Sequence, residues 1–562
     1  MNKLLSIFIL ACVTLSLADA SFLRKKFQEA NPLNNPSDKK STQYQGFETT
    51  NNVQSVIVLN ESELQAGTTS TVRLRTVGWK PKQYMVSQSA AFTGVTWKDM
   101  PASREFDLTL TGAAGLVPVY SKLSLYDNTT VLFTNTVMYN ELSLSNVAPG
   151  GSGYTSNFAY PAIYSSKLYF QGHDGTYRRL YSLDTSEALS SIAPETIFGA
   201  ENMFIHSGIM YFHRFDSGGN GNAFYYNGGT TAQIPRVGGV YHDYSSGFTN
   251  ALSLGSTLIF KGKTGSSVDA LLSYASGGNL YGPPTAGGSD YDHGCDQPIA
   301  AADGTNVYYR GYTSGAVPKI YYAYEFGYGG TLQMTSDGAS HPYVTGYDAP
   351  IRLNNLVLFK GKGSDNIERI YGASNNVVYE PQEATGGAPT YESNFANPIA
   401  FNGMIYFQGY SGATRYIYAA SIQSGLPGIS CAVGSGSDYS SGFTCPIVSG
   451  SYLYFEATSL MAGAKIYRIS TADAITSISK GTSDFSNGFS NQIVYNSRIY
   501  FSGLSTNSVR KIYVLDNSTV ANVIAAASDY SNSFNNPAVY NGRLYFQGVS
   551  TNNIQKIYSF IR

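Results

Sequence analysis

The feature that most constrains this chain is an apolar, aromatic strand sequence that recurs from Gly150 to the C-terminus. Its nine copies are Leu168–Phe170, Met210–Phe212, Leu258–Phe260, Val307–Tyr309, Val357–Phe359, Ile405–Phe407, Leu453–Phe455, Ile499–Phe501 and Leu544–Phe546. Successive copies are 42 to 50 residues apart, and a period in the forties with several short strands per unit is typical of propeller blades. The sequence therefore predicts an all-β chain with a large β-propeller of about nine four-stranded blades.

Each copy of this strand stands between two other recurring segments. A turn pair such as Asn402-Gly403 or Asn541-Gly542 precedes it, and these residue types tolerate the positive φ that a two-residue hairpin requires. A basic-aliphatic-Tyr segment such as Lys511–Tyr513 or Lys556–Tyr558 follows it as a third strand. The central strand is apolar throughout rather than alternating, which indicates that neighbouring blades cover both of its faces.

The ends of the repeat region predict how the ring closes. The last copy stops after its third strand, and the segment 142–147, directly before the first copy, aligns with the missing fourth strand. We therefore expect the propeller to occupy residues 141–562, with 142–147 as the strand that completes the last blade. The alternatives are an open array, or a ring in which the short copy around Met210 is an insertion.

The N-terminal segment has the pattern of a secretory signal peptide. Residues 1–20 combine Lys3, an apolar run and the small residues Ala18 and Ala20, as a signal peptidase site requires. Lipid attachment at Cys12 is a competing interpretation. Residues 21–46 lack apolar periodicity and are expected to form a flexible leader or propeptide. No later apolar run approaches the roughly 20 residues that span a bilayer, so we expect a secreted, extracellular protein without a membrane span.

Residues 47–140 have a different hydrophobic pattern, with short segments in which apolar and polar residues alternate. Such segments, separated by Gly, Ser and Asn, predict a small β-sandwich, and Trp79 and Trp97 are expected to fill the space between its sheets. The segment Met85–Asp127 resembles the immunoglobulin-like modules of secreted and surface proteins. The repeats from Gly150 onward resemble secreted propellers built from Leu-Tyr-Phe and basic-Ile-Tyr blade strands. Both resemblances imply a fold and leave the function open.

Charge is sparse and balanced along the chain. Lys and Arg total 36 and Asp and Glu total 37, so the chain lacks the one-signed field that holds a phosphate backbone. Nucleic acid is therefore not expected as a partner. A net charge near zero also weakens the repulsion between copies, which permits self-association.

A loop motif that begins with Asp precedes the first strand of several copies: Asp243–Phe248, Asp438–Phe443, Asp484–Phe489 and Asp529–Phe534. The aspartates could form a ring of calcium or sugar ligands. The alternative is that Asp and Ser bond the turn backbone while the aromatic residues wedge between blades. We favour this structural interpretation, because a binding site seldom needs every copy.

The six histidines lie only in the first five copies. Three of them occupy the same loop of adjacent copies, close to aspartates, and imidazole with carboxylate is a ligand set that metals accept. The candidate site for a divalent metal consists of His242, His293, His341, Asp243, Asp290 and Asp292. The alternative is that these are ordinary exposed loop residues, and no other cofactor is expected.

Three cysteines remain after removal of the signal segment. Cys431 and Cys445 flank one junction between copies and are expected to form a disulfide in an oxidising compartment. Cys295 replaces a loop Phe and is expected to be buried and unpaired. Three N-x-Ser/Thr glycosylation sequons begin at Asn60, Asn128 and Asn517.

No local catalytic motif is evident in the sequence, which lacks an HExxH segment, a phosphate loop and a clear nucleophile-base pair. We therefore expect a secreted, non-enzymatic binding or adhesion protein whose propeller face or rim contacts a glycan, a matrix component or another protein. The first alternative is a structural subunit of an extracellular fibre or coat. The second is a polysaccharide hydrolase or lyase. A site, if present, should lie where the copies differ, in the irregular copies one to five.

Overall fold

The computed structural model divides into two compact units, one formed by Met1–Gly112 with Leu116–Tyr139 and the other by Ala113–Gly115 with Asn140–Arg562. The structure describes residues 53–58, 71–78, 80–110, 115–139, 144–146, 153–192, 198–215, 221–234, 244–265, 267–275, 280–281, 290–301, 303–304, 306–323, 331–333, 335–336, 342–374, 377–380, 382–383, 390–423, 426–431, 438–460, 463–481, 483–516, 519–523 and 529–560. The expected signal segment and leader, residues 1–46, lie outside this part of the chain. Within it, no helix is long and apolar enough to cross a membrane.

The first unit consists of two sheets around one core. Their strand orders are β1-β2-β5 and β4-β3-β6-β7. The strands are β1 (Val53–Val58), β2 (Thr71–Gly78), β3 (Gln83–Ser87), β4 (Lys98–Asp99), β5 (Glu105–Thr109), β6 (Gly115–Ser124) and β7 (Thr130–Tyr139). Leu74 of one sheet and Leu123 of the other are both fully buried in this core, so the two sheets form a sandwich.

The prediction that tryptophan fills this core is wrong for Trp97. Its side chain is 36% exposed. Tyr84 and Phe106 occupy the core instead, with their ring centroids 4.5 Å apart. Trp79 lies outside the described residues.

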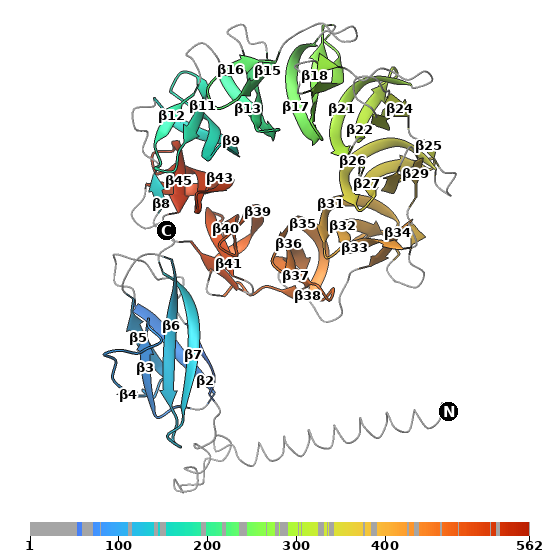
Figure 1. The fold of residues 1–562 in the computed structure, drawn as a ribbon. Helices are drawn as coiled ribbons and strands as arrows, with labels where there is room; N and C mark the ends of the chain where they lie inside the picture. The colour runs from blue at the N-terminus through green and yellow to red at the C-terminus, as the bar shows by residue number, and fades with distance from the viewer. Residues whose placement is uncertain are drawn as a thin grey trace, which may run out of the picture. The chain divides into compact units, whose positions relative to one another are not determined.

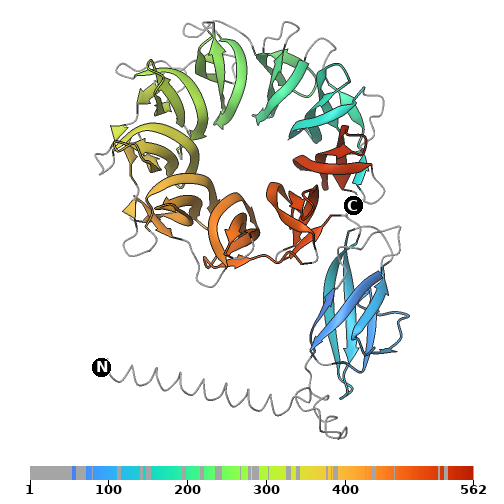
Figure 2. The ribbon, with the colours of Figure 1, turned by 180° about the vertical axis from the view of Figure 1, so that it is seen from behind.

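The second unit is a β-propeller in which, among the described residues, nine sheets radiate from a common axis (Figures 1 and 2). Each sheet is one blade, and the four strands of a blade are counted from the inside outward, so that the first strand of a blade is its innermost one (Figure 1). From the inside outward, blades one to four are β9 (Ser156–Tyr164), β10 (Lys167–His173), β11 (Arg178–Leu183), β12 (Leu189–Ser191); β13 (Phe198–His206), β14 (Ile209–Phe215), β15 (Gly221–Tyr226), β16 (Thr231–Gln233); β17 (Tyr244–Leu254), β18 (Thr257–Thr264), β19 (Asp269–Ala275), β20 (Leu280–Tyr281); and β21 (Tyr291–Ala300), β22 (Val307–Thr313), β23 (Pro318–Ala323), β24 (Thr331–Gln333). The prediction of a repeat-built propeller is therefore confirmed.

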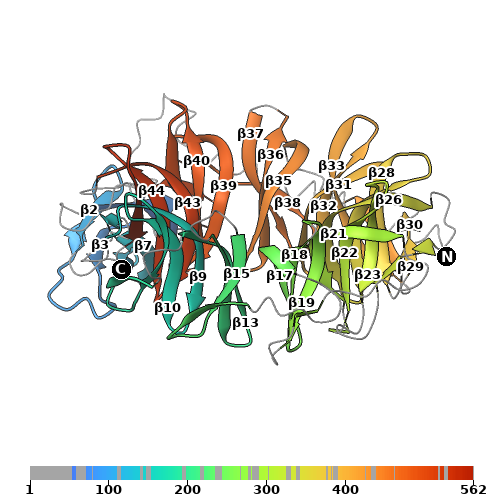
Figure 3. The same cartoon turned by 90° about the horizontal axis from the view of Figure 1, so that it is seen from above.

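The remaining five blades follow the same plan. In the same order they are β26 (Tyr343–Leu353), β27 (Leu356–Gly363), β28 (Glu368–Ser374), β29 (Val377–Tyr379); β31 (Ser393–Phe401), β32 (Met404–Ser411), β33 (Thr414–Gln423), β34 (Leu426–Cys431); β35 (Tyr439–Ser449), β36 (Tyr452–Ser459), β37 (Gly463–Ser470), β38 (Ile475–Ser477); β39 (Phe485–Tyr495), β40 (Arg498–Ser505), β41 (Arg510–Asp516), β42 (Thr519–Asn522); and β43 (Tyr530–Tyr540), β44 (Arg543–Ser550), β45 (Gln555–Phe560), β8 (Leu144–Asn146). Seen from above, the blades stand side by side around the ring (Figure 3).

The repeated Leu-Tyr-Phe segment forms the second strand of each blade and is buried on both faces. In β44, Leu544, Tyr545 and Phe546 are at most 1% exposed, and the other copies are buried in the same way. The preceding turn residues Asn541 and Gly542 have φ values of 47° and 68°, as a type I′ hairpin turn requires. The predicted hairpin and the predicted two-sided burial are both confirmed.

The first strand of each blade links that blade to the next one. At one bulge position every first strand has a residue with positive φ: Tyr160, Asn202, Asn250, Gln297, Ala349, Asn397, Cys445, Asn491 and Asn536. Asn is common there because it tolerates the left-handed conformation better than most residues. Each of the five asparagines donates its side-chain N–H to a backbone carbonyl of the following blade, at 2.7 to 3.2 Å.

Three of the segments between blades attach to the outer edge of the blade that they enter. β25 (Thr335–Ser336) pairs in parallel with β29 of blade five, and β30 (Gln382–Glu383) pairs in parallel with β34 of blade six. Before blade eight, Ser479 forms a parallel bridge with Thr519. At blades five, six and eight the chain therefore pairs with the outside of the blade before it enters that blade's innermost strand.

The last blade contains strands from both ends of the unit. β8 pairs antiparallel with β45, which places Leu144 opposite Phe560. Asn536 of blade nine donates to the carbonyl of Phe158 in blade one at 2.8 Å. The ring is thus closed, and blade two, which contains Met210, is a complete four-stranded sheet.

Candidate functional site

The Asp of the repeated loop motif is bonded within its own blade. In blade nine, Asp529 accepts a hydrogen bond from Lys556 Nζ at 2.6 Å and another from the Tyr558 hydroxyl at 2.8 Å. The hydrogen bond from Lys556 lowers the pKa of Asp529 by more than burial raises it. The same two bonds to a Lys and a Tyr are made by Asp290, Asp438 and Asp484. These carboxylates fasten the third strand to the loop before the first strand.

Three of the six predicted metal ligands lie in the described part of the chain, and the structure does not gather them into a metal site. Asp290 bonds Lys319 and Tyr321 of its own blade, whereas Asp292 bonds His293. Within the described ranges, no group of three His, Cys, Asp or Glu side chains could hold a metal ion. The predicted ligands outside those ranges are His242, Asp243 and His341.

The predicted disulfide between Cys431 and Cys445 is not formed in the structure. Cys431 lies on β34, near the outer edge of blade six, and Cys445 lies on β35, the innermost strand of blade seven. Strands about 4.8 Å apart put these positions at opposite edges of their sheets, which is too far for a disulfide. The thiol of Cys431 donates instead to the carbonyl of Ile417 at 3.7 Å. Cys295 is fully buried.

Of the predicted glycosylation sequons, only one lies in the described part of the chain. Asn128 has a φ of 64° in the turn between β6 and β7 and is exposed. An attached glycan would therefore find room at this position. The other two sequon residues, outside the described ranges, are Asn60 and Asn517.

The blades differ in charge at one pair of facing positions on their first two strands. The pair is neutral in four blades: Ala159–Gln171, Ala396–Gln408, Ser490–Ser502 and Asn535–Gln547. It contains ionisable residues in five: Glu201–His213, Thr249–Lys261, Asp296–Arg310, Asp348–Lys360 and Thr444–Glu456. Four of these five are the consecutive blades two to five, so charge gathers on one side of the ring.

The second-strand residue of this pair joins its blade to the next. Gln171 of blade one accepts a backbone N–H of blade two at 2.9 Å. In blade three Lys261 instead forms an ion pair with Asp296 of blade four at 2.9 Å. Arg310 of blade four bonds Asp296 at 3.1 Å and Asp348 of blade five at 2.5 Å. A chain of ion pairs therefore runs across three blades.

Burial and ion pairing act in opposite directions on the pKa of Asp296. Burial raises this pKa, but the hydrogen bonds from Lys261, Arg310 and Tyr312 outweigh burial and hold the pKa below its ordinary value. Hydrogen bonds to Asp269 and Asp296 also outweigh burial at Lys261 and raise the pKa of its ammonium group. Asp296 therefore remains an ionised hydrogen-bond acceptor at neutral pH.

A titratable pair of rings lies next to this chain of ion pairs. His293 on β21 faces Tyr312 on β22, and their rings stack with centroids 5.2 Å apart and an interplanar angle of 13°. Nδ1 of His293 lies 2.7 Å from a carboxylate oxygen of Asp292, and the Tyr312 hydroxyl donates to Asp296 at 3.0 Å. The His293 side chain is 32% exposed. We call Asp292, His293, Asp296, Arg310 and Tyr312 the blade-four cluster.

Lysine takes the place of Tyr312 in the blades on either side. Lys263 faces Ser246 in blade three, and Lys362 faces Thr345 in blade five. Lys263 is exposed. The Lys362 ammonium lies 3.9 Å from a carboxylate oxygen of Glu368. Of the two flanking ammonium groups, that of Lys263 is therefore the one that favours an anionic ligand.

The blade-four cluster has the parts of an acid-base pair. When Asp292 accepts the Nδ1–H of His293, Nε2 keeps its lone pair and can take a proton. Burial and the hydrogen bond to Asp296 raise the pKa of Tyr312, so its hydroxyl stays protonated at neutral pH and can act as a proton donor. Arg310 holds Asp296 in place as the acceptor for that hydroxyl.

Known proteins resemble this chain only in fold. No protein-family model and no curated protein matches the chain. Similar solved structures include a puromycin hydrolase (10% identity, TM-score 0.32, covering 64% of this chain and 60% of that one) and a Mycobacterium tuberculosis puromycin-hydrolyzing peptidase (10%, 0.32, 62% and 58%). The β-propeller domain of the Trilobed protease from Pyrococcus furiosus is another (8%, 0.31, 56% and 94%). The match spans less than two thirds of each of the two hydrolase chains.

The comparison runs against the prediction of a non-enzymatic binding or adhesion protein, since two hydrolases are among the similar structures. A TM-score of 0.32 at 10% identity assigns no activity to this chain. That prediction rested on the absence of a local catalytic motif. His293 and Tyr312 are separated in sequence and meet only through strand pairing, so they form no local motif. The sequence carries a signal at His293, because blades three, five and seven have Ser246, Thr345 and Ser441 at this position. Tyr312 carries no such signal, because a tyrosine, Tyr410, also occupies its position in blade six.

Proposed function

We propose that the protein is an enzyme that cleaves an acidic polysaccharide by β-elimination at the blade-four cluster. The observation that carries the proposal is the stacking of His293, oriented by Asp292, on Tyr312. This pair supplies a proton acceptor and a proton donor side by side. Lys263 flanks it with positive charge, which suits the carboxylate of a uronate residue.

The reaction can be written with residues of this chain. Nε2 of His293 removes the proton from the carbon next to the uronate carboxylate, and the electron pair of that C–H bond forms a carbon-carbon double bond as the bond to the glycosidic oxygen breaks. The Tyr312 hydroxyl gives its proton to the departing oxygen. A flanking lysine neutralises the carboxylate and so favours loss of the proton. Transfer of the proton from the imidazolium to the phenolate restores the starting state, and the step requires no cofactor.

β-Elimination fits the cluster better than hydrolysis. Glycoside hydrolysis typically uses two carboxyl groups, one of which must be protonated to act as the acid. Asp296 is bonded to Lys261, Arg310 and Tyr312, and these contacts keep its pKa low. A carboxylate held in this way cannot serve as the general acid.

The proposal also includes the cellular setting that the sequence suggests. Residues 1–20 would direct the protein out of the cell, where acidic polysaccharides occur. The two-sheet core of the first unit supports an immunoglobulin-like spacer. A glycan is the expected partner, and the balanced charge of the chain supports a second copy as a further partner.

A turnover assay tests the proposed function. The purified full chain is incubated with pectate, alginate, hyaluronan and, as a neutral control, dextran, and the products are analysed for unsaturated uronate ends by ultraviolet absorbance and mass. We expect cleavage of an acidic polymer only, and a loss of at least about 100-fold in His293→Ala and in Tyr312→Phe. Tyr410→Phe changes the tyrosine at the corresponding position of blade six and should leave turnover unchanged.

Two outcomes of this assay would contradict the proposal. Saturated chain ends in the products would show hydrolysis in place of elimination. Absence of cleavage of every acidic polymer would refute the enzymatic function.

A further inference from the structure

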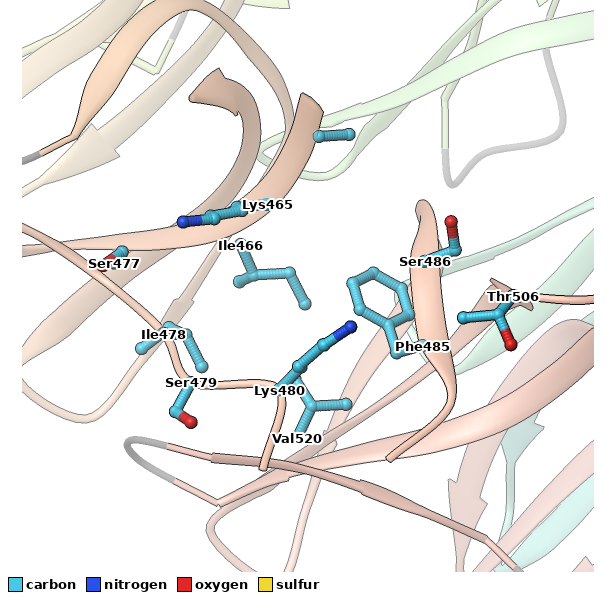
Figure 4. Close-up of a pocket in the computed structure, with 11 residues that line it drawn as sticks. Lys465, Ile466, Ser477, Ile478, Ser479, Lys480, Phe485, Ser486, Thr506 and Val520 are labelled. Carbon is cyan, nitrogen blue, oxygen red and sulfur yellow. The ribbon is translucent and has the colours of Figure 1, made fainter. Parts of the chain in front are cut away.

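A cavity lies between blades seven and eight, apart from the blade-four cluster. Its volume is about 460 Å³, which is within the usual size range of small-molecule sites. Ile466, Ile478, Phe485 and Val520 give it apolar walls, and Lys480 contributes an ammonium group. Figure 4 shows the Lys480 side chain extending toward the ring of Phe485.

The linker between the two blades forms one side of this cavity. Ser479 bridges in parallel to Thr519 on β42, and its carbonyl accepts the N–H of Val520 at 2.9 Å. The linker is thereby fastened to blade eight directly before Lys480. This anchoring fixes the backbone from which Lys480 reaches into the cavity.

One residue of the cavity wall departs from the repeat. In five other blades the second residue of the loop motif is a tyrosine whose hydroxyl accepts a backbone N–H from the third strand of the preceding blade: Tyr154, Tyr244, Tyr291, Tyr343 and Tyr391. In blade eight this residue is Phe485, and the corresponding N–H belongs to Ile466. A phenyl ring cannot accept that bond, so the wall at Ile466 offers a hydrogen-bond donor.

From these two donors we propose that the cavity binds a small organic anion, with one carboxylate or sulfonate group on an apolar body of one or two rings. The anionic group bonds the Lys480 ammonium and the Ile466 N–H, and the apolar body lies against Phe485. Lys465 also lines the cavity, but its ammonium group is already paired with Asp438. This site is independent of the proposed cleavage of polysaccharide.

Isothermal titration of the full chain with naphthoate, and with the uncharged naphthamide, tests the proposal. We expect one saturable site for naphthoate. Naphthamide should bind the wild type at least about tenfold more weakly than naphthoate does, and naphthoate should bind Lys480→Gln at least about tenfold more weakly than the wild type. In both cases a hydrogen bond between charged groups is lost. Lys98→Gln in the first unit is the matched control and should bind naphthoate like the wild type.

Phe485→Tyr provides a second variant that should keep the fold, because it restores the residue that most other blades have. Its hydroxyl would accept the Ile466 N–H and occupy the place of the anion, so we expect naphthoate to bind about tenfold more weakly. No saturable binding of naphthoate, or equal affinity for naphthamide, would overturn the proposal. Wild-type affinity in both Lys480→Gln and Phe485→Tyr would overturn it as well.

Discussion

Removal of the Asp529 carboxylate should destabilise the propeller through a buried tyrosine. Tyr558 is fully buried, its hydroxyl donates to Asp529 at 2.8 Å, and Lys556 bonds the other carboxylate oxygen at 2.6 Å. In Asp529→Ala the hydroxyl loses its acceptor, which costs about 1–3 kcal/mol. The partly exposed ion pair adds about 0–1 kcal/mol. We therefore expect the free energy of unfolding to fall by about 1–4 kcal/mol.

A double-mutant cycle shows whether this loss comes from the hydrogen bond. Tyr558→Phe removes the donor and should cost about 1 kcal/mol. The double variant should cost about 1 kcal/mol less than the sum of the two single variants, because both remove the same bond. Calorimetric unfolding measures these changes, with Asp107→Ala on the surface of the first unit as the control. Additive effects, or a loss in Asp529→Ala no larger than in Asp107→Ala, would refute the structural role of the motif.

Acid should weaken the propeller below about pH 4, because the hydrogen bond from its lysine lowers the pKa of Asp529 in the folded state. The ionised carboxylate therefore stabilises the fold at pH values above its pKa in the unfolded state, and this stabilisation is lost as the pH falls through its pKa in the folded state. Calorimetry across this range should show that acid lowers the stability of Asp529→Asn less than that of the wild type. Gly548→Ala should lower the free energy of unfolding by about 1–3 kcal/mol, because the added Cβ would lie 2.7 Å from the ring of the buried Tyr558. Gly229→Ala is the control: its Cβ would meet open space, so the same measurement should show no change in stability. Asn491→Ala and Asn536→Ala should each lower the free energy of unfolding by about 1 kcal/mol. Asn491 bonds blade eight to blade nine, and Asn536 makes the same bond between blade nine and blade one, where the ring closes. A loss of stability at Asn491 alone would show that the ring is open in solution.

The features that the sequence predicted well are those that every blade needs. Each copy of the apolar strand must be covered on both faces, and each hairpin needs residues that accept positive φ. The prediction of propeller blades therefore rested on nine independent copies of the same pattern. The alignment of 142–147 with a missing strand located the seam, where β8 pairs with β45. The basic-Ile-Tyr strand was also found, although its bond to the loop Asp became visible only in the structure.

The features that could not be predicted depend on register and on distance across the sheet. Positive φ at Gly294 and Gln297 marks two bulges in β21, and the pairing of Asp296 with Arg310 depends on how many residues these bulges absorb. Closeness in sequence was misleading for the cysteines, because the fourth strand of one blade and the first strand of the next lie at opposite edges. The blade-four cluster combines both difficulties.

The central claim is that the repeat holds the ring together and that the departures in blade four carry the chemistry. The most direct measurement compares the unfolding midpoint and the polysaccharide cleavage of a His293→Ser, Tyr312→Thr double variant, which has the residues of blade seven at these positions. We predict an unfolding midpoint within about 1 °C of the wild type and a loss of cleavage of at least about 100-fold. Asp438→Ala should show the reverse, a lower midpoint with unchanged turnover. Continued cleavage by the double variant, or no cleavage by the wild type, would contradict the claim.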